Sequence, residues 1–73
     1  MNYIEYTFTI APMGVASEIL VAELAEVGFE SFVDTETGLQ AYIQEPLWNA
    51  DILSDIQILR SEEFQITYTH QTI

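Results

Sequence analysis

The side chains of this protein that could do chemistry are too scattered to form a catalytic group. His70 is the single histidine, and it lies three residues from the end of the chain, where we expect a solvated side chain rather than a general base. Glu62 and Glu63 are adjacent, so they point apart in extended backbone. Ser17 has no neighbouring base that could activate it. We therefore predict no catalytic residue among these 73 residues.

Ligand-binding motifs are missing from the sequence as well. Asp34 and Glu36 flank a turn, but their spacing matches no calcium-binding loop. Gly14, Gly28 and Gly38 are isolated, which excludes a dinucleotide fingerprint and a P-loop. The sequence has no cysteine, so disulfides and thiolate metal sites are excluded too. We predict no metal and no cofactor site in this chain, and its function should be one of binding.

Charge restricts the class of partner. Twelve Asp and Glu residues face a single basic residue, Arg60, and the net charge is -11. Such a surface repels nucleic-acid phosphates and anionic lipids, because both are bound through Lys and Arg. A high net charge favours solubility, and it also attracts a basic protein through long-range electrostatic steering. We expect a basic protein partner, no nucleic acid and no membrane.

The chain start and the composition bear on location. Residues 1–5 carry no positively charged region and no long apolar run, so we expect neither a secretory signal nor a membrane span. The lack of cysteine suits a reducing compartment. We predict a cytoplasmic protein.

The elements that must position any binding surface follow from periodicity. Residues 3–10 alternate with period two, which predicts a half-buried strand. Residues 17–27, which can extend back to Val15, predict a helix that ends at Gly28. Its expected apolar stripe is Ile19, Leu20, Leu24 and Val27. Residues 29–35 and 39–45 predict a hairpin around a short loop that contains glycine.

The last third of the chain predicts a second helix and a final strand. Asn49 can cap this helix, and Arg60 would lie in its last turn. Its expected apolar stripe is Ile52, Leu53, Ile56 and Leu59. Residues 64–69 alternate again and predict a strand.

The order strand, helix, strand, strand, helix, strand predicts an α+β fold, a ferredoxin-like two-layer sandwich of βαββαβ type. We expect an antiparallel four-stranded sheet of order 4-1-3-2 with both helices on one face. Within it, the central first and third strands are expected to run parallel to each other.

The uncovered sheet face is the expected docking surface. Its expected members are Glu5, Thr7, Thr9, Gln40, Tyr42, Gln65, Thr67 and Phe32. The candidate partner-binding residues are Tyr42, Phe32, Glu5, Thr7 and Gln40. The competing surface is the helix face that carries Glu18, Glu23 and Glu26. Trp48 has two open interpretations, as an interface anchor or as a lid over the second helix.

Three stretches of the sequence are similar to a known family. They are the opening residues 1–8 (MNYIEYTF), residues 17–32 (SEILVAELAEVGFESF) and residues 38–43 (GLQAYI). These residues resemble the PrmA family, the ribosomal protein L11 methyltransferases, and most closely the versions of Bacteroidetes-type bacteria. The similarity extends over essentially the whole chain, and its motifs are structural rather than catalytic.

The resemblance implies a two-part enzyme, a protein-lysine N-methyltransferase that depends on S-adenosylmethionine. In the family, an N-terminal ferredoxin-like domain recognises the basic ribosomal protein, and a linked Rossmann-like domain binds the cofactor and methylates amino groups. This sequence ends at Ile73, before any such second domain. Residues 1–73 are therefore expected to be a single ferredoxin-like substrate-recognition domain, an expressed fragment that neither binds S-adenosylmethionine nor transfers methyl groups.

A second interpretation stays open at this point. The chain could be a free-standing acidic regulatory or oligomerisation domain of the ferredoxin-like type. A reading frame that continues past Ile73 into a glycine-rich strand-turn-helix would favour the first interpretation, and a stop codon there would favour the second.

Overall fold

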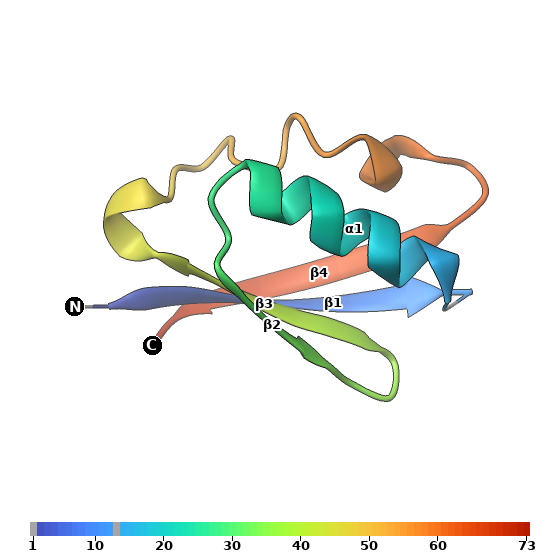
Figure 1. Cartoon of the computed structure of the whole chain (residues 1–73), viewed down its shortest axis with the longest axis horizontal. Coiled ribbons are helices and arrows are strands. Elements are labelled where there is room, and N and C mark those ends of the chain that lie inside the picture. The colour runs from blue at the N-terminus through green and yellow to red at the C-terminus, as the bar shows by residue number, and fades with distance from the viewer. Residues whose placement is uncertain (1, 13) are drawn as a thin grey trace.

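The computed structural model describes residues 2–12 and 14–73. Its centre is a four-stranded antiparallel sheet, against which the helix and the turns pack (Figure 1). The elements are β1 (Tyr3–Ala11), α1 (Val15–Glu26), β2 (Ser31–Asp34), β3 (Gly38–Gln44), the 3-10 turns η1 (Glu45–Leu47) and η2 (Gln57–Arg60), and β4 (Gln65–Thr72). The strand order is β2-β3-β1-β4, which confirms the predicted order. The fold is a small α+β fold.

The predicted parallel direction of the first and third strands is wrong. β1 and β3 pair antiparallel, with Tyr3 opposite Gln44 and Thr9 opposite Gly38. The reason is geometric. The crossover through α1 brings β2 back parallel to β1, and the β2–β3 hairpin then reverses the chain once more. β4 also pairs with β1 in the antiparallel sense, so every neighbouring pair in the sheet is antiparallel.

The alternation of the two central strands builds the core as predicted. One face of each strand is buried, namely Ile4, Tyr6, Phe8 and Ile10 of β1 and Leu39, Ala41 and Ile43 of β3. Residues directly opposite each other in an antiparallel pair point to the same side of the sheet. The two buried sets therefore form one continuous apolar surface.

Helix α1 covers this surface through residues spaced four apart. Ala16, Leu20 and Leu24 are fully buried, whereas Ile19, expected in the stripe, is 40% exposed. The helix ends as predicted at Gly28, whose φ of 114° suits a residue without a side chain. The main-chain N–H of Gly28 donates to Ala25 at 3.3 Å, and that of Phe29 donates to Leu24 at 3.1 Å. Together these bonds make a Schellman motif that buries Phe29 against the core.

The predicted second helix does not form. Within the described residues the chain contains one α-helix, and residues 49–60 are turns that end in η2. Asn49, Asp51, Ser54 and Asp55 lie in this segment, and such side chains compete with helix formation by bonding nearby main-chain groups. Asn49 does so, since its Oδ1 accepts the N–H of Asp51 at 2.9 Å.

A contact from α1 holds the turn segment in place. The two carboxylate oxygens of Glu23 accept the main-chain N–H groups of Gln57 and Ile58, at 2.5 and 3.0 Å. The turns then bury Ile52, Ile56 and Ile58 against the sheet. They bury apolar side chains as the predicted helix would have done, but by a different backbone path.

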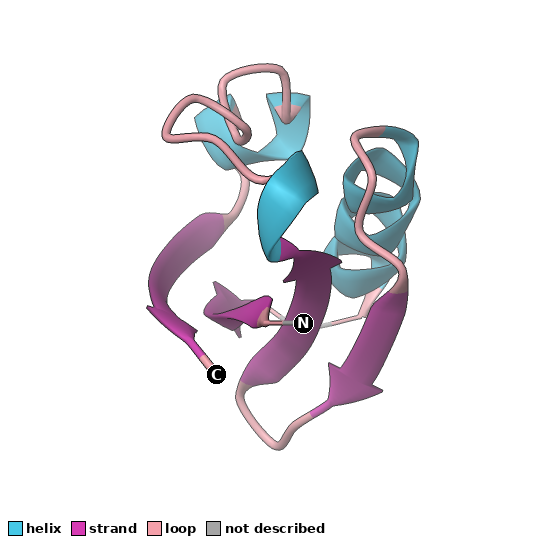
Figure 2. Ribbon diagram, turned by 90° about the vertical axis from the view of Figure 1, so that its left-hand side faces the viewer, coloured by secondary structure: helices cyan, strands magenta, loops and turns pink. Residues whose placement is uncertain are grey.

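The layers follow from these contacts. Helix α1 and the segment 45–62 lie on the same side of the sheet, and no described element lies over its other side (Figures 1 and 2). This arrangement leaves half of the side chains of β1 and β3 on an uncovered face.

Truncating either of two buried side chains tests the assignment of the core. Leu24→Ala in α1 and Ile56→Ala in the turn segment remove fully buried apolar groups, since these residues are 0% and 1% exposed. Each should lower the free energy of unfolding by roughly 2–5 kcal/mol in denaturant melts. Ile19→Ala on the exposed side of α1 is the matched control and should cost below about 1 kcal/mol. Equal losses in all three variants would contradict the assignment.

Candidate functional site

The uncovered face of the sheet is built by the odd-numbered residues of β1 and their partners. In the register, Thr7 lies opposite Gln40 and Thr69, and Thr9 lies opposite Thr67. The expected members Glu5, Thr7, Thr9, Gln40, Tyr42, Gln65 and Thr67 all lie on this face. We call these seven residues, together with Tyr3, Ser31, Val33, Thr69 and Gln71, the open face.

Phe32 does not belong to the open face, and its predicted position is wrong. It pairs with Ala41, which is buried, so its ring points to the helix side and packs against the core. The β2 residues on the open face are Ser31 and Val33 instead. The expected strand 29–35 carried Phe29 on one side and Phe32 on the other. In the structure Phe29 precedes β2 and is buried, and the pairing register places Phe32 on the core side as well.

A row of hydrogen-bonded side chains crosses the open face from β3 through β1 to β4. Glu5 lies between Tyr42 on β3 and Gln71 on β4. The Tyr42 hydroxyl donates to Glu5 Oε2 at 2.8 Å, and Gln71 Nε2 donates to Glu5 Oε1 at 2.8 Å. Both oxygens of one carboxylate are thereby fixed by two strands. Gln71 was missed because the predicted strand stopped at residue 69, although the alternation continues beyond it.

These bonds change the titration of the groups involved. Hydrogen bonds from Gln71 and then Tyr42 lower the pKa of the Glu5 carboxyl below its ordinary 4.5. The hydrogen bond to Glu5 raises the pKa of the Tyr42 hydroxyl above 10.0. The shifts favour the ionised form of Glu5 and the neutral form of Tyr42.

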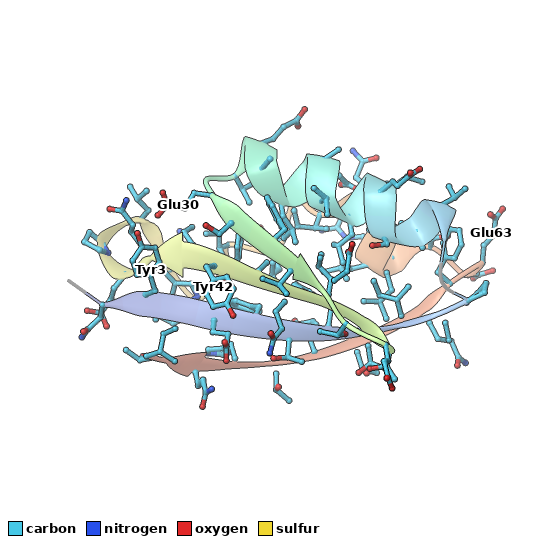
Figure 3. All side chains as sticks on the ribbon, turned by 60° about the horizontal axis from the view of Figure 1, so that its bottom comes forward. Tyr3, Glu30, Tyr42 and Glu63 are labelled. Atoms are coloured by element: carbon cyan, nitrogen blue, oxygen red, sulfur yellow. The ribbon has the colours of Figure 1, made fainter. Side chains whose placement is uncertain are left out.

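A second tyrosine and carboxylate lie beside this row. Hydrogen bonding to Glu30 and its negative charge raise the pKa of the Tyr3 hydroxyl. Tyr3, Tyr42 and Glu30 lie at the same end of the sheet (Figure 3). A shallow depression of about 290 Å³ adjoins Glu5 toward β4, lined by Glu5, Thr7, Thr69, His70 and Gln71. The open face thus offers a fixed carboxylate, aromatic rings and hydroxyls, which is a binding chemistry rather than a catalytic one.

The side of the sheet under the turn segment carries an aromatic cluster. The indole Nε1 of Trp48 donates to the Tyr6 hydroxyl at 2.8 Å. The His70 ring stacks on Tyr6 with centroids 4.8 Å apart, and it lies 5.6 Å from the Trp48 ring. Trp48 therefore packs over the sheet, and the second helix that it was expected to cover as a lid does not form.

The competing acidic surface on α1 is smaller than the sequence suggests. Glu23 already binds the main chain of η2, so it is committed to the fold. Glu18 and Glu26 are exposed. A hollow of about 710 Å³ lies beside Glu18 and is lined by Gly14, Ser17, Glu18, Val21 and Asp34. Unlike the open face, it has no row of hydrogen-bonded side chains among the described residues.

Other kinds of site are not seen in the described part of the chain. Residues 2–12 and 14–73 contain no group of three His, Cys, Asp or Glu side chains that could hold a metal ion. No described helix is both long enough and apolar enough to cross a membrane.

Comparison with known proteins confirms the resemblance predicted from the sequence. The chain is 41% identical over 71 residues to a ribosomal protein L11 methyltransferase of Bacteroides fragilis, which covers 94% of this chain and 25% of that protein. The corresponding protein of Bacteroides thetaiotaomicron is 40% identical over 72 residues, or 96% of this chain and 26% of that protein. That of Phocaeicola vulgatus is 46% identical over 57 residues, or 77% and 20%.

The chain spans about a quarter of the length of these relatives. No family model matches the chain, and no solved structure matches it.

A titration of Glu5 tests the hydrogen-bonded row. Its pKa is lowered in the folded chain, so the row stabilises the fold above the unfolded value of about 4.5, and this contribution is lost as pH falls through the folded pKa. Carboxyl NMR should show a Glu5 midpoint below 4.5. Gln71→Ala should raise the midpoint more than Tyr42→Phe does, because the bond from Gln71 is the larger cause. A midpoint that neither variant moves would show that the row does not form in solution.

Proposed function

Since this chain is homologous over nearly its whole length to a part of the ribosomal protein L11 methyltransferases, we propose that it is their N-terminal substrate-recognition domain. In this proposal it binds a basic ribosomal protein, L11, so that a covalently linked domain that uses S-adenosylmethionine can methylate amino groups of the partner. This chain contributes recognition alone. The homologues are named as methyltransferases, which supports S-adenosylmethionine as the cofactor of the full-length protein. Methylation of a ribosomal protein suits the cytoplasmic location expected from the sequence.

The architecture supports the same proposal. Strand order β2-β3-β1-β4 and the crossover through α1 match the sheet of a ferredoxin-like sandwich. We propose that the domain is a variant of that sandwich in which the turns of residues 49–60 replace the second helix. The replacement leaves the opposite side of the sheet unchanged and uncovered.

The observation that carries the proposed function is the row across the open face. Glu5 stays ionised, and Tyr42 and Gln71 hold both of its oxygens in fixed positions. A carboxylate that is already oriented loses little conformational freedom when a lysine or arginine of a partner approaches it. The Tyr42 ring adds apolar area and a polar end, the combination common at interface anchors. The open face therefore suits a basic partner better than scattered surface carboxylates do.

The net charge of the whole chain should mainly raise the rate at which the chain and a basic partner associate. A net charge of -11 accelerates association with a basic protein, and salt screens this attraction. Binding of L11 should therefore weaken as ionic strength rises. Specificity should come from the fixed groups of the open face.

Tyr42→Ala should weaken binding of L11 by about tenfold or more, as removal of an interface anchor does. The change deletes the ring and one of the two bonds that orient Glu5. Calorimetric titration of L11 at low and high salt measures the effect. Melting curves show whether the fold survives.

The matched control is the double change Glu18→Gln and Glu26→Gln on α1. It removes two exposed charges and leaves Glu23, which η2 needs. This variant should bind somewhat more slowly at low salt and almost normally at high salt. If it loses affinity while Tyr42→Ala retains it, the docking surface is the helix and the proposal for the open face is wrong.

A further inference from the structure

The two edge strands of the sheet, β2 and β4, differ in how well they are protected against pairing with another strand. β2, at one edge, has only four residues, follows Glu30 and ends in Asp34. Short length and charge are the usual means by which proteins keep an edge strand from pairing. β4, at the other edge, has eight residues and contains no proline and no glycine. Seven of its eight residues are exposed.

β4 also lies in a ten-residue stretch of the chain that is free of charged side chains. Residues 64–73 contain no Asp, Glu, Lys or Arg, although the chain as a whole has twelve acidic residues. The strand is instead rich in threonine, isoleucine and tyrosine, which favour sheet structure. Neither length nor charge protects this edge.

The hydrogen bonds of the sheet show which groups of β4 are free to pair. Tyr3 and Ile73 exchange both main-chain bonds, at 3.2 and 2.8 Å. Such pairs alternate along an antiparallel ladder, so the odd-numbered residues of β4 bond to β1. The even-numbered residues direct their N–H and C=O groups to the free edge. They are Ile66, Tyr68, His70 and Thr72.

We propose that β4 pairs antiparallel with β4 of a second copy of this chain, which joins two sheets edge to edge. Local charge selects this occupant. A second copy is as acidic as the first, and the β4 edge is where it can approach without opposing carboxylates. A basic partner would find no acidic side chain to attract it at this edge.

The free groups also determine the register. If Thr69 lies opposite Thr69 of the second copy, each even-numbered residue meets another even-numbered residue. Tyr68 then faces His70 of the partner copy, and Ile66 faces Thr72. This register uses every outward-directed residue of both strands and forms about eight main-chain hydrogen bonds, two for each such pair. It is symmetric about a two-fold axis, as most homodimers are. The stretch 64–73 without charged side chains covers the whole paired region.

The pairing should be weak and should respond to salt in the opposite sense to partner binding. One edge strand buries less than the roughly 1,200 Å² of a standard interface, so the dimer should appear only at high protein concentration. Two chains of net charge -11 repel each other, and salt screens that repulsion. Raising the ionic strength should therefore strengthen the dimer.

A single introduced cysteine tests both pairing and register, because the chain has no cysteine of its own. Thr69→Cys places two thiols on the two-fold axis at a non-hydrogen-bonded pair, where the Cα atoms are about 4.5 Å apart and a disulfide can form. Thr67→Cys is the matched control on the same strand and face. Its two thiols would lie about 13 Å apart along the strands, too far for a disulfide.

Under mild oxidation, Thr69→Cys should form a covalent dimer several-fold faster than Thr67→Cys, and the difference should increase with salt. Sedimentation of the unaltered chain should show a dimer that grows with concentration and with salt. Equal cross-linking of the two variants, or a monomer at every concentration, would overturn the proposal.

Discussion

The alternation of β1 is the constraint on which the other features depend. β1 lies between β3 and β4, so it is the strand that both of them need as a partner. Its even-numbered residues, from Ile4 to Ile10, are buried and set the inner face of the whole sheet. Its odd-numbered residues are then directed to the side that no described element covers. A shift of one residue would exchange the two sets, which makes the register of this strand decisive for both the core and the open face.

The sequence predicts well where one local pattern decides the structure. The alternation of β1 and β3 and the end of α1 at Gly28 are of this kind, because each depends on residues that are close in the chain. The second helix failed because two influences competed. Its apolar spacing was helical, but Asn49 and its polar neighbours favour turns, and Glu23 from a distant part of the chain binds the turn backbone. Such a long-range contact leaves no local pattern.

The candidate site was predictable to a similar extent. Alternation placed Glu5, Thr7, Gln40 and Tyr42 on one face, and the register confirms this placement. It placed Phe32 on the wrong face, since the expected strand 29–35 carried Phe29 on one side and Phe32 on the other and the answer depends on the pairing of Phe32 with Ala41. Alternation along the chain also does not reveal the row from Tyr42 through Glu5 to Gln71, because that row runs across three strands. Whether these residues bind a partner stays a prediction.

One small sheet carries a charged surface, the open face, and an uncharged one, the β4 edge. The open face holds an ionised carboxylate in a fixed position, whereas the β4 edge carries no charged side chain. The proposed roles therefore differ in their response to salt, since a basic partner is attracted by the net charge and a second copy is repelled by it. Both roles leave α1 and the turn segment as support for the sheet, with Glu23 as the link between them.

The most direct test of the account is an NMR titration of the isotope-labelled chain with ribosomal protein L11, at a chain concentration low enough to keep it monomeric. The account predicts that the largest changes in amide shifts occur at Glu5, Thr7, Gln40 and Tyr42. Small changes are expected along the exposed side of α1. Changes concentrated at Glu18 and Glu26, with the open face unaffected, would contradict the account.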